Sequence, residues 1–314
     1  MIRTLRWPAL LLAAVLTACA GPQIKPESGV AAELAATPFF AQEDHQCGPA
    51  ALATVLAADG VEITPDQLTP LIYIPGRKGS LQTELVAATR HYGRVPYVLD
   101  GGLDALIAEV ESGKPVLVLQ NLGVSYWPAW HYAVVIGFDP AKNQLILRSG
   151  RKERITMGSR SFMRSWKLAE QWAMVVTPPG KTPASAQPES WVRRAAACES
   201  LNQPQVAMQA YEAGLQRWPQ SPLLWFASAN AAYAQHDLPK ASAALKRAVE
   251  LAPDDAAARN NYAQVLYEQG CVIAAQREIG LALQHASREQ RAELERTQAQ
   301  LGTPSAVAKS GCPD

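Results

Sequence analysis

The strongest constraint on the fold is a repeat of 34 residues in the last third of the chain. Residues of the same kind recur at this spacing: Ala207, Ala241 and Ala275; Pro219 and Pro253; Tyr233 and Tyr267; and Tyr211, Leu245 and Ile279. The residues between them are almost all helix formers. A period of this length predicts stacked helical units, with small residues where helices cross and proline after the second helix of each unit.

This pattern resembles tetratricopeptide repeats. Two units match it well, residues 221–253 and residues 254 to about 285, whereas a first unit over residues 191–219 is partial. His236 stands where the repeat usually has glycine. The resemblance implies an all-α repeat domain over residues 189–300, with a concave surface for a protein or peptide partner. The alternative is a plain helical bundle.

The first 19 residues have the pattern of an export signal. Arg3 and Arg6 precede a short apolar run over residues 7–16, and the sequence Leu-Thr-Ala-Cys ends at Cys19. About ten apolar residues are too few to span a bilayer, which needs about 20. The pattern resembles a bacterial lipoprotein signal peptide over residues 1–18, which implies a lipid on Cys19. The alternative is an ordinary signal peptide with an accidental cysteine.

The lipoprotein resemblance also implies a location. Ala20 rather than Asp follows Cys19, which by resemblance to lipoproteins of Gram-negative bacteria implies the outer membrane, with the protein facing the periplasm. Disulfides form in that compartment, so the sequence leaves open any pairing of three cysteines: Cys198, Cys271 and Cys312.

Composition excludes several other functions. The net charge of +1 gives no electrostatic reason to expect a nucleic-acid partner. The five cysteines are too scattered for a zinc cluster, and the sequence contains no Gly-rich phosphate loop, so neither a metal nor a cofactor is expected. Two segments without periodicity are expected as a tether, residues 19–38, and a proline-rich linker, residues 179–188. Residues 301–314 are expected as a tail.

Residues 39–178 carry helix patterns first and strand patterns afterwards. Helices are expected at residues 49–58, from residue 65 after a Thr64 cap, from Ser80 to near residue 93, at 103–110 and at 161–172. Strands are expected at residues 95–99, 116–120, 131–138, 144–148, 155–157 and 173–176. The order predicts an α+β domain with a mostly antiparallel sheet.

One cysteine of this domain lies where a helix is expected to begin. Cys47 comes two residues before Pro49, which suits a first helical turn because it lacks a backbone donor. A helix N-terminus lowers the pKa of a thiol, so Cys47 is a candidate nucleophile. Its base is expected to be His131, which opens an apolar strand after an aromatic loop. The alternative for Cys47 is a buried structural cysteine.

Three segments resemble the bacteriocin-processing, papain-like double-glycine cysteine peptidases of family 39. They are Gln42 with Cys47-Gly48-Pro49-Ala50-Ala51-Leu52, then Gly113-Lys114-Pro115-Val116-Leu117-Val118, then His131-Tyr132-Ala133-Val134-Val135-Ile136-Gly137. The resemblance covers residues 39–178 and implies a papain-like fold with Cys47 as nucleophile and His131 as general base. It also implies that Gln42 and the Cys47 backbone N–H stabilise the oxyanion, with Gln46 as the alternative glutamine.

The third catalytic position departs from the family. An Asp or Asn usually orients the imidazole from the strand after the histidine strand, but that strand here, residues 145–150, has no carboxylate. Ser149 is the expected substitute, and Asn143 and Asp139 are alternatives. Since a misoriented imidazole lowers the rate by orders of magnitude, a non-catalytic binding or assembly lipoprotein is the second hypothesis.

The sequence therefore predicts a lipid-anchored cysteine peptidase that acts on a peptide or protein substrate and carries repeats for a protein partner. Acyl or peptidyl transfer through the same thioester differs only in the acceptor. The double-glycine preference is not expected, because no exporter domain is present. The loop from Tyr126 to Trp130 is expected either to form a wall of the substrate groove or to cover the core.

Overall fold

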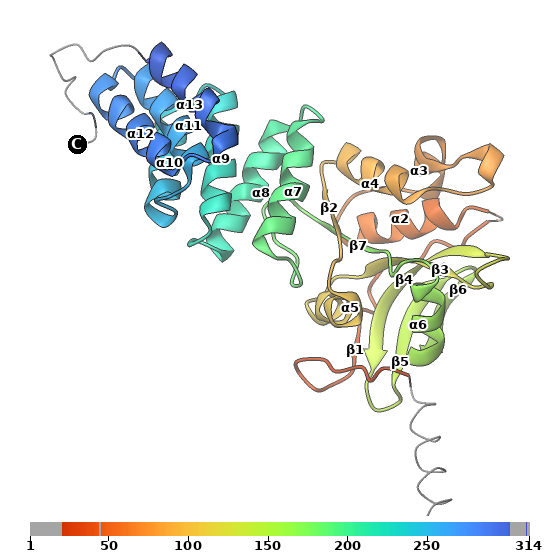
Figure 1. Cartoon of the computed structure of the whole chain (residues 1–314). Coiled ribbons are helices and arrows are strands. Elements are labelled where there is room, and N and C mark those ends of the chain that lie inside the picture. The colour runs from red at the N-terminus through yellow and green to blue at the C-terminus, as the bar shows by residue number, and fades with distance from the viewer. Residues whose placement is uncertain (1–20, 44, 302–311, 313–314) are drawn as a thin grey trace, which may run out of the picture. The chain divides into compact units, whose positions relative to one another are not determined.

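The computed structural model of the chain describes residues 21–43, 45–301 and 312 (Figure 1). These residues form two compact units, divided between Pro178 and Ala186. Cys19, the expected signal peptide and most of the expected tail lie outside the described residues. None of the helices in the described part of the chain is long and apolar enough to cross a membrane.

The first unit is built around an antiparallel sheet. Its strands are β1 (Ala32–Glu33), β2 (Val95–Val98), β3 (Val116–Asn121), β4 (Trp130–Asp139), β5 (Gln144–Ser149), β6 (Lys152–Gly158) and β7 (Ala173–Thr177). The order across the sheet is β2-β7-β3-β4-β5-β6, and β1 pairs with β4 off this path. Each neighbouring pair is antiparallel. The predicted α+β architecture is therefore confirmed.

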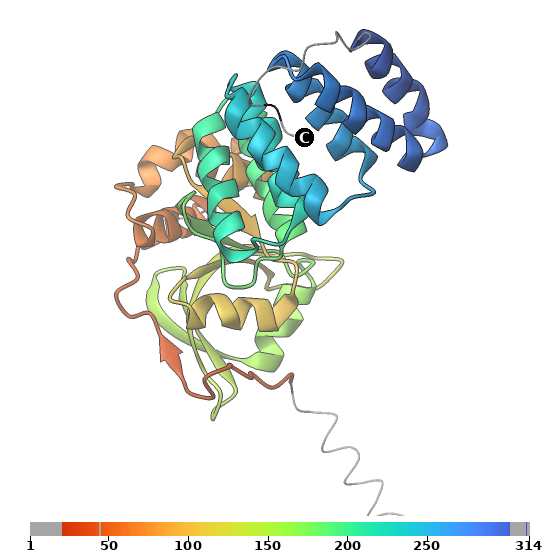
Figure 2. The same ribbon diagram turned by 90° about the vertical axis from the view of Figure 1, so that its left-hand side faces the viewer.

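Helices cover both faces of this sheet, as Figure 2 shows for α5 and the α2–α4 group. The helices are α2 (Cys47–Ala58), α3 (Pro65–Ile72), α4 (Gln82–His91), α5 (Gly102–Glu111) and α6 (Ser159–Lys167), with a 3-10 turn η1 (Pro75–Arg77). On one face Leu52 and Leu85 pack with Leu117, Val134 and Met174 of the strands. This face buries the apolar side of α2 and so holds its N-terminus at a fixed place over the sheet.

The segment expected as a tether packs against the sheet over most of its length. Ile24 is buried, and Ala32 of β1 pairs with Phe138 of β4. This packing follows from the strand register. β3 pairs with β4 only as far as Val135, so the backbone of β4 beyond Val135 is left unpaired by β3 on this edge. An unpaired strand edge attracts another strand, and β1 fills it. The expected tether at residues 19–38 is therefore folded in its described part.

Some of the helix ends predicted from local sequence patterns are confirmed, and others are wrong. Gln67 accepts a hydrogen bond from the Thr64 backbone N–H at 2.9 Å and so completes a capping box, which confirms Thr64 as the predicted cap. Ser80 does not cap α4, whose N-cap is Leu81. The helix expected at residues 161–172 ends at Lys167, because Glu170 and Gln171 adopt positive φ angles of 55°. A left-handed conformation cannot continue an α-helix.

The second unit consists of helices that follow the 34-residue period. They are α7 (Pro188–Glu199), α8 (Pro204–Arg217), α9 (Pro222–Ala234), α10 (Leu238–Leu251), α11 (Ala256–Glu268), α12 (Val272–His285) and α13 (Arg288–Gln300). The three alanines of the period, Ala207, Ala241 and Ala275, are each 0% exposed. They lie where the second helix of each unit is tightly packed, so the predicted stack of helical units is confirmed.

The turn within each helical pair explains a departure from the repeat pattern. Asn202, His236 and Gly270 are spaced by 34 residues and have positive φ angles of 59°, 61° and 83°. Glycine adopts this left-handed region without strain, and asparagine and histidine are enriched there among other residues. His236 therefore adopts the backbone conformation of a glycine, and Asn202 extends the repeat into the partial first unit.

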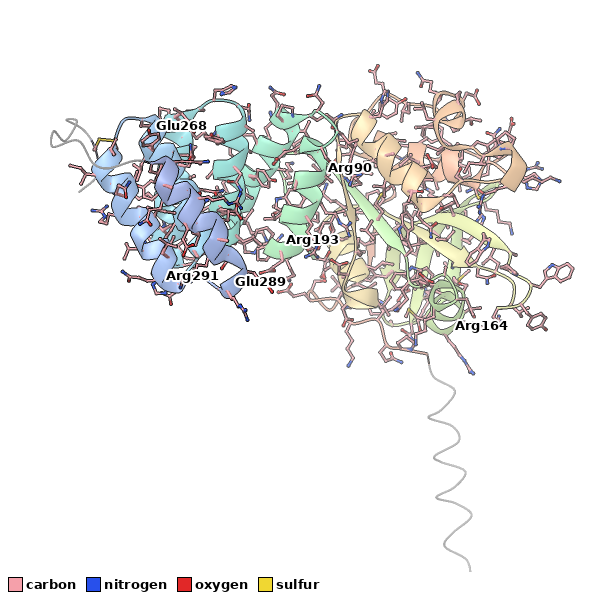
Figure 3. All side chains as sticks on the ribbon, turned by 45° about the horizontal axis from the view of Figure 1, so that its top comes forward. Arg90, Arg164, Arg193, Glu268, Glu289 and Arg291 are labelled. Atoms are coloured by element: carbon pink, nitrogen blue, oxygen red, sulfur yellow. A yellow bond between two sulfur atoms is a disulfide. The ribbon has the colours of Figure 1, made fainter. Side chains whose placement is uncertain are left out.

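A disulfide joins Cys271 to Cys312, whose Cα atoms are 5.5 Å apart. It appears in Figure 3 as the yellow bond beside the C-terminal helices. Cys271 is the N-cap of α12, so the bond fixes the residue near the end of the chain to a repeat helix. Cys198 is buried and takes no part in this disulfide. Of the pairings that the sequence left open, the structure contains this one.

Candidate active site

Cys47 is the first residue of α2, as its sequence predicts. The first N–H groups of a helix have no partner within it, so they point toward a side chain or ligand at this end. Gly48 follows, and a Cβ built on it would lie 2.5 Å from Ser80 Oγ. Only glycine leaves room for this close approach, which closes one side of the Cys47 turn.

The side chain of His131 on β4 contacts the side chain of Ser149 on the neighbouring strand β5. Val134 lies opposite Arg148 in the β4–β5 register, which puts Ser149 beside Ala133, two residues from His131 on the same face. His131 Nε2 is 2.8 Å from Ser149 Oγ. Since this contact occupies Nε2, Nδ1 is the ring nitrogen left for a reacting group. Ser149 thus lies where an imidazole-orienting residue is needed.

The Cys47 thiol lies against the same strand. The backbone N–H of Tyr132, the residue after His131, forms a hydrogen bond that favours the Cys47 thiolate, as does the N–H of Gly48. Burial outweighs both and raises the pKa of the Cys47 thiol. Burial also lowers the pKa of His131. The sequence prediction of a lowered thiol pKa is therefore wrong for this structure, in which thiol and imidazole are both neutral near pH 7.

Gln42 is the glutamine that reaches this site. Its backbone N–H donates to Gly150 O at 3.1 Å and its side-chain Nε2 donates to Tyr132 O at 3.3 Å. Gln42 also lines a small cavity together with Ser149. The amide nitrogen carries a second hydrogen, which is available to an oxyanion.

The alternative glutamine and the alternative orienting residues lie elsewhere. Gln46 is the N-cap residue of α2, and its Oε1 accepts from Thr69 Oγ1 of α3 at 3.4 Å. Asn143 binds the backbone of Pro22 and Ile24 beyond the far end of β4. Asp139 ends that strand, about 25 Å along it from His131. Ser149 is therefore the candidate that the structure brings to the imidazole.

Arg148 is a residue of the site that no sequence motif indicated. Its side chain is 6% exposed, and its guanidinium donates to the carbonyls of Ala35 at 3.0 Å, Thr37 at 2.8 Å and Glu153 at 2.7 Å. Residues 35–37 lead directly to Gln42, so Arg148 holds the segment that carries the oxyanion candidate. A lone arginine in the apolar run of β5 was the available signal, since buried arginine needs several acceptors.

The aromatic loop between β3 and β4 does not cover the core. Tyr126 is 87% exposed, Trp127 79% and Trp130 55%. Of the two interpretations that the sequence allowed, core cover is therefore wrong. Within the described residues there is no group of three or more His, Cys, Asp or Glu side chains arranged to hold a metal ion.

Two family models match the chain. Residues 35–174 match the Peptidase_C39 like family, and residues 188–231 match the tetratricopeptide repeat. No curated protein matches the chain.

Solved structures resemble each region. A C39-like peptidase from Bacillus anthracis is 16% identical, with 47% of this chain and 97% of its own chain covered and a TM-score of 0.39. The peptidase domain of Streptococcus ComA, a bi-functional ABC transporter, is 22% identical, with 45% and 98% covered and a TM-score of 0.37.

The tetratricopeptide-repeat domain of P58(IPK) is 20% identical, with 37% of this chain covered and a TM-score of 0.35. This chain spans about a third of that chain, with 33% covered. The family matches agree with the resemblance drawn from the Cys47 and His131 segments and from the 34-residue period. Residues 35–174 accordingly form a peptidase C39-like domain, and the helices that begin at residue 188 belong to tetratricopeptide repeats.

Proposed function

We propose that this protein is a cysteine peptidase in which Cys47 is the nucleophile and His131 the general base. Cys47 Sγ bonds to the carbonyl carbon of a peptide while His131 accepts the thiol proton. His131 then gives that proton to the departing amine, and water hydrolyses the thioester to restore the thiol. The Gln42 amide and the Cys47 backbone N–H stabilise the oxyanion.

The observation that supports this proposal most directly is the contact between His131 Nε2 and Ser149 Oγ at 2.8 Å. It leaves Nδ1 for the thiol and fixes the ring plane on the strand whose next residue, Tyr132, contacts the Cys47 sulfur. The neutral resting pair suits general-base catalysis, because an imidazole that stays unprotonated near pH 7 is ready to accept a proton.

The proposed setting is the outer membrane of a bacterium, with a lipid on Cys19 and both units in the periplasm. The Cys271–Cys312 disulfide supports an oxidising compartment. In this proposal the repeats recruit a protein partner or a peptide substrate to the peptidase. The net charge of +1 supports the absence of nucleic acid among the partners.

A second function is favoured by one specific observation. Burial raises the pKa of Cys47, whereas an activated cysteine usually has a lowered pKa. In this alternative the C39-like domain is a non-catalytic binding or assembly module, and the repeats act as a scaffold.

Cleavage of a peptide library separates the two functions. The full chain and its Cys47→Ala variant are incubated with a proteome-derived peptide library, and new N-termini are identified by mass spectrometry. Cleavage by the native chain that is absent from Cys47→Ala and from His131→Ala supports the peptidase. Cleavage that survives Cys47→Ala, or none with the native chain, overturns it. Cys198→Ala serves as a control, because that thiol is buried in the other unit.

A further inference from the structure

The loop between β3 and β4, residues 122–129, and Trp130 at the start of β4 display aromatic side chains to solvent. Leu122, Tyr126, Trp127 and Trp130 are all more than half exposed. Large apolar side chains grouped on a surface usually mark a place where a partner binds. The proposed reaction described above does not use these side chains.

The loop is fixed before any partner arrives. Asn121 is 2% exposed, and its Oδ1 accepts from the N–H groups of Gly123 at 3.0 Å and Ala129 at 2.9 Å. Val124 and Trp127 exchange two backbone hydrogen bonds of 3.2 Å. A Cβ on Gly123 would lie 2.3 Å from Trp127 O, so the tight loop requires glycine. A preorganised loop loses little entropy on binding.

The loop also lacks charge. Its sequence, Leu-Gly-Val-Ser-Tyr-Trp-Pro-Ala-Trp over residues 122–130, contains no acidic or basic side chain. An apolar, neutral surface favours apolar side chains of a partner. It offers no lysine or arginine to the anionic headgroups of a membrane.

Its position along the strand argues against a lipid partner as well. Trp130 begins β4, whereas the turn after β4 holds the start of the described chain, where Asn143 Nδ2 donates to Pro22 O at 3.2 Å. In Figure 1 the arrowhead of β4 lies by β1, at the end of the strand away from Trp130. A strand of ten residues spans about 30 Å.

The proposed anchor would therefore lie far from the loop. Cys19 precedes Gly21 by two residues, which reach at most about 7 Å. A lipid on Cys19 would hold the β4–β5 turn close to the bilayer and leave the loop and His131 at the opposite end of β4. This position favours a partner that reaches the active site from solution over a lipid of the bilayer.

We propose that Tyr126, Trp127 and Trp130 bind an apolar segment of the peptide substrate and so select peptides with aliphatic or aromatic side chains near the scissile bond. This inference rests on the proposed peptidase function. The loop runs into β4 at Trp130, the residue directly before the base, so a peptide held on the loop is brought to the end of the strand that carries His131.

The first test uses binding, which does not require cleavage. In the Cys47→Ala chain, tryptophan fluorescence is titrated with two acetylated, amidated peptides, Ser-Leu-Phe-Leu-Ser and its all-serine counterpart. We expect the apolar peptide to bind at least about tenfold more tightly, a difference that two buried aliphatic or aromatic side chains readily supply. The Tyr126→Ser/Trp127→Ser variant should remove this difference. Equal binding of both peptides, or a difference that survives in the variant, overturns the inference.

Matched controls separate this outcome from a folding defect and from failure of the proposed function. Val30→Ser and Leu71→Ser also remove exposed apolar side chains from the first unit and should leave the preference intact. If the native chain cleaves the library, apolar residues should be enriched beside its cleavage sites, and only the loop variant should lose that enrichment. If no peptide is cleaved, the peptidase fails while the binding test still decides the loop.

Liposomes of phosphatidylethanolamine and phosphatidylglycerol test the alternative that the loop binds a membrane. Both proteins carry Cys19→Ser, so that no lipid is attached. We expect the protein with the native loop and the Tyr126→Ser/Trp127→Ser variant to co-sediment with the liposomes to the same extent. Sedimentation that depends on the loop would identify a membrane-binding element and overturn the assignment to substrate.

Discussion

Ser149 Oγ lies 2.8 Å from His131 Nε2, so the imidazole contacts a hydroxyl where the family resemblance implies a carboxylate or an amide. A hydroxyl orients the ring but adds no negative charge to stabilise an imidazolium. This agrees with the pKa of His131, which burial holds below its ordinary value of 6.5. The site therefore has an oriented imidazole without an ion-pair partner.

Replacement of Ser149 tests whether this contact orients the base. Ser149→Ala should lower kcat by about 10- to 100-fold with a smaller change in KM, because the ring loses its only side-chain contact on Nε2 that the structure gives. Ser149→Asp should retain activity and raise the pKa of His131, because a carboxylate favours the charged ring. The pH profile of cleavage measures both. An Ala variant with native kcat would show that Ser149 has no role.

Alkylation against pH tests the neutral resting pair. Because burial raises the pKa of Cys47 above its ordinary value of 9.0, less thiolate is present at any pH than in a free thiol. The iodoacetamide rate should therefore remain low at pH 7 and inflect above 9.0. Cys47→Ala gives the background from other thiols. An inflection well below 9.0 would mean an ion pair between Cys47 and His131 instead.

Arg148 is expected to stabilise the domain and to position Gln42. Arg148→Met leaves three carbonyls without their donor, those of Ala35, Thr37 and Glu153. Loss of charged hydrogen bonds in a buried place should lower the free energy of unfolding by about 3 kcal/mol. Hydrogen exchange of the β5 amides measures this change within the first unit, and Arg148→Lys should restore part of it.

A second arginine provides the control for this effect. Arg154 pairs with Glu33 of the same N-terminal segment at 2.7 Å, but its side chain is 51% exposed. Arg154→Gln should change stability little, since exposed ion pairs contribute little. In the variants that still fold, Arg148→Met should lower kcat more than Arg154→Gln does. Equal effects of the two substitutions would remove the positioning role.

Predictions from the sequence succeeded where the information was local or periodic. The start of α2 follows from Pro49 and the apolar run behind it, and the helical pairs follow from alanines 34 residues apart. The pairing of β1 with Phe138 depends instead on where β3 stops, a register that no local pattern carries. The family resemblance favoured Gln42, but spacing alone left Gln46 as an alternative, because the choice depends on which side chain reaches Tyr132.

The Cys47 pKa shows a related limit. The helix N-terminus and its N–H groups predict a lowered value, and the structure contains those contacts. Burial beneath the surrounding elements acts in the opposite direction and is the larger effect. The degree of burial is a property of the packed domain, so the direction of the pKa shift could not be predicted from the residues that surround Cys47 in the sequence.

Two helical glycines of the repeats give opposite predictions for the same substitution. A Cβ on Gly214 would lie 2.8 Å from Leu224 Cδ2 and 2.9 Å from Trp191 Cδ1, whereas a Cβ on Gly280 would meet nothing within 4 Å. Trp191 is fully buried and its Nε1 donates to Ala210 O at 2.7 Å, so it cannot move without loss of that bond.

Gly214→Ala should therefore destabilise the repeats, because overpacking costs about 1–3 kcal/mol and exceeds the gain of up to about 1 kcal/mol from the better helix former. Gly280→Ala should gain that amount without the clash. Hydrogen exchange of the α7–α9 and α12 amides measures each change in its own helices, which avoids treating a two-unit chain as a single transition. Slower exchange in Gly214→Ala would mean that Trp191 and Leu224 adjust to the added methyl group, and faster exchange in Gly280→Ala would mean that α12 has no room for it.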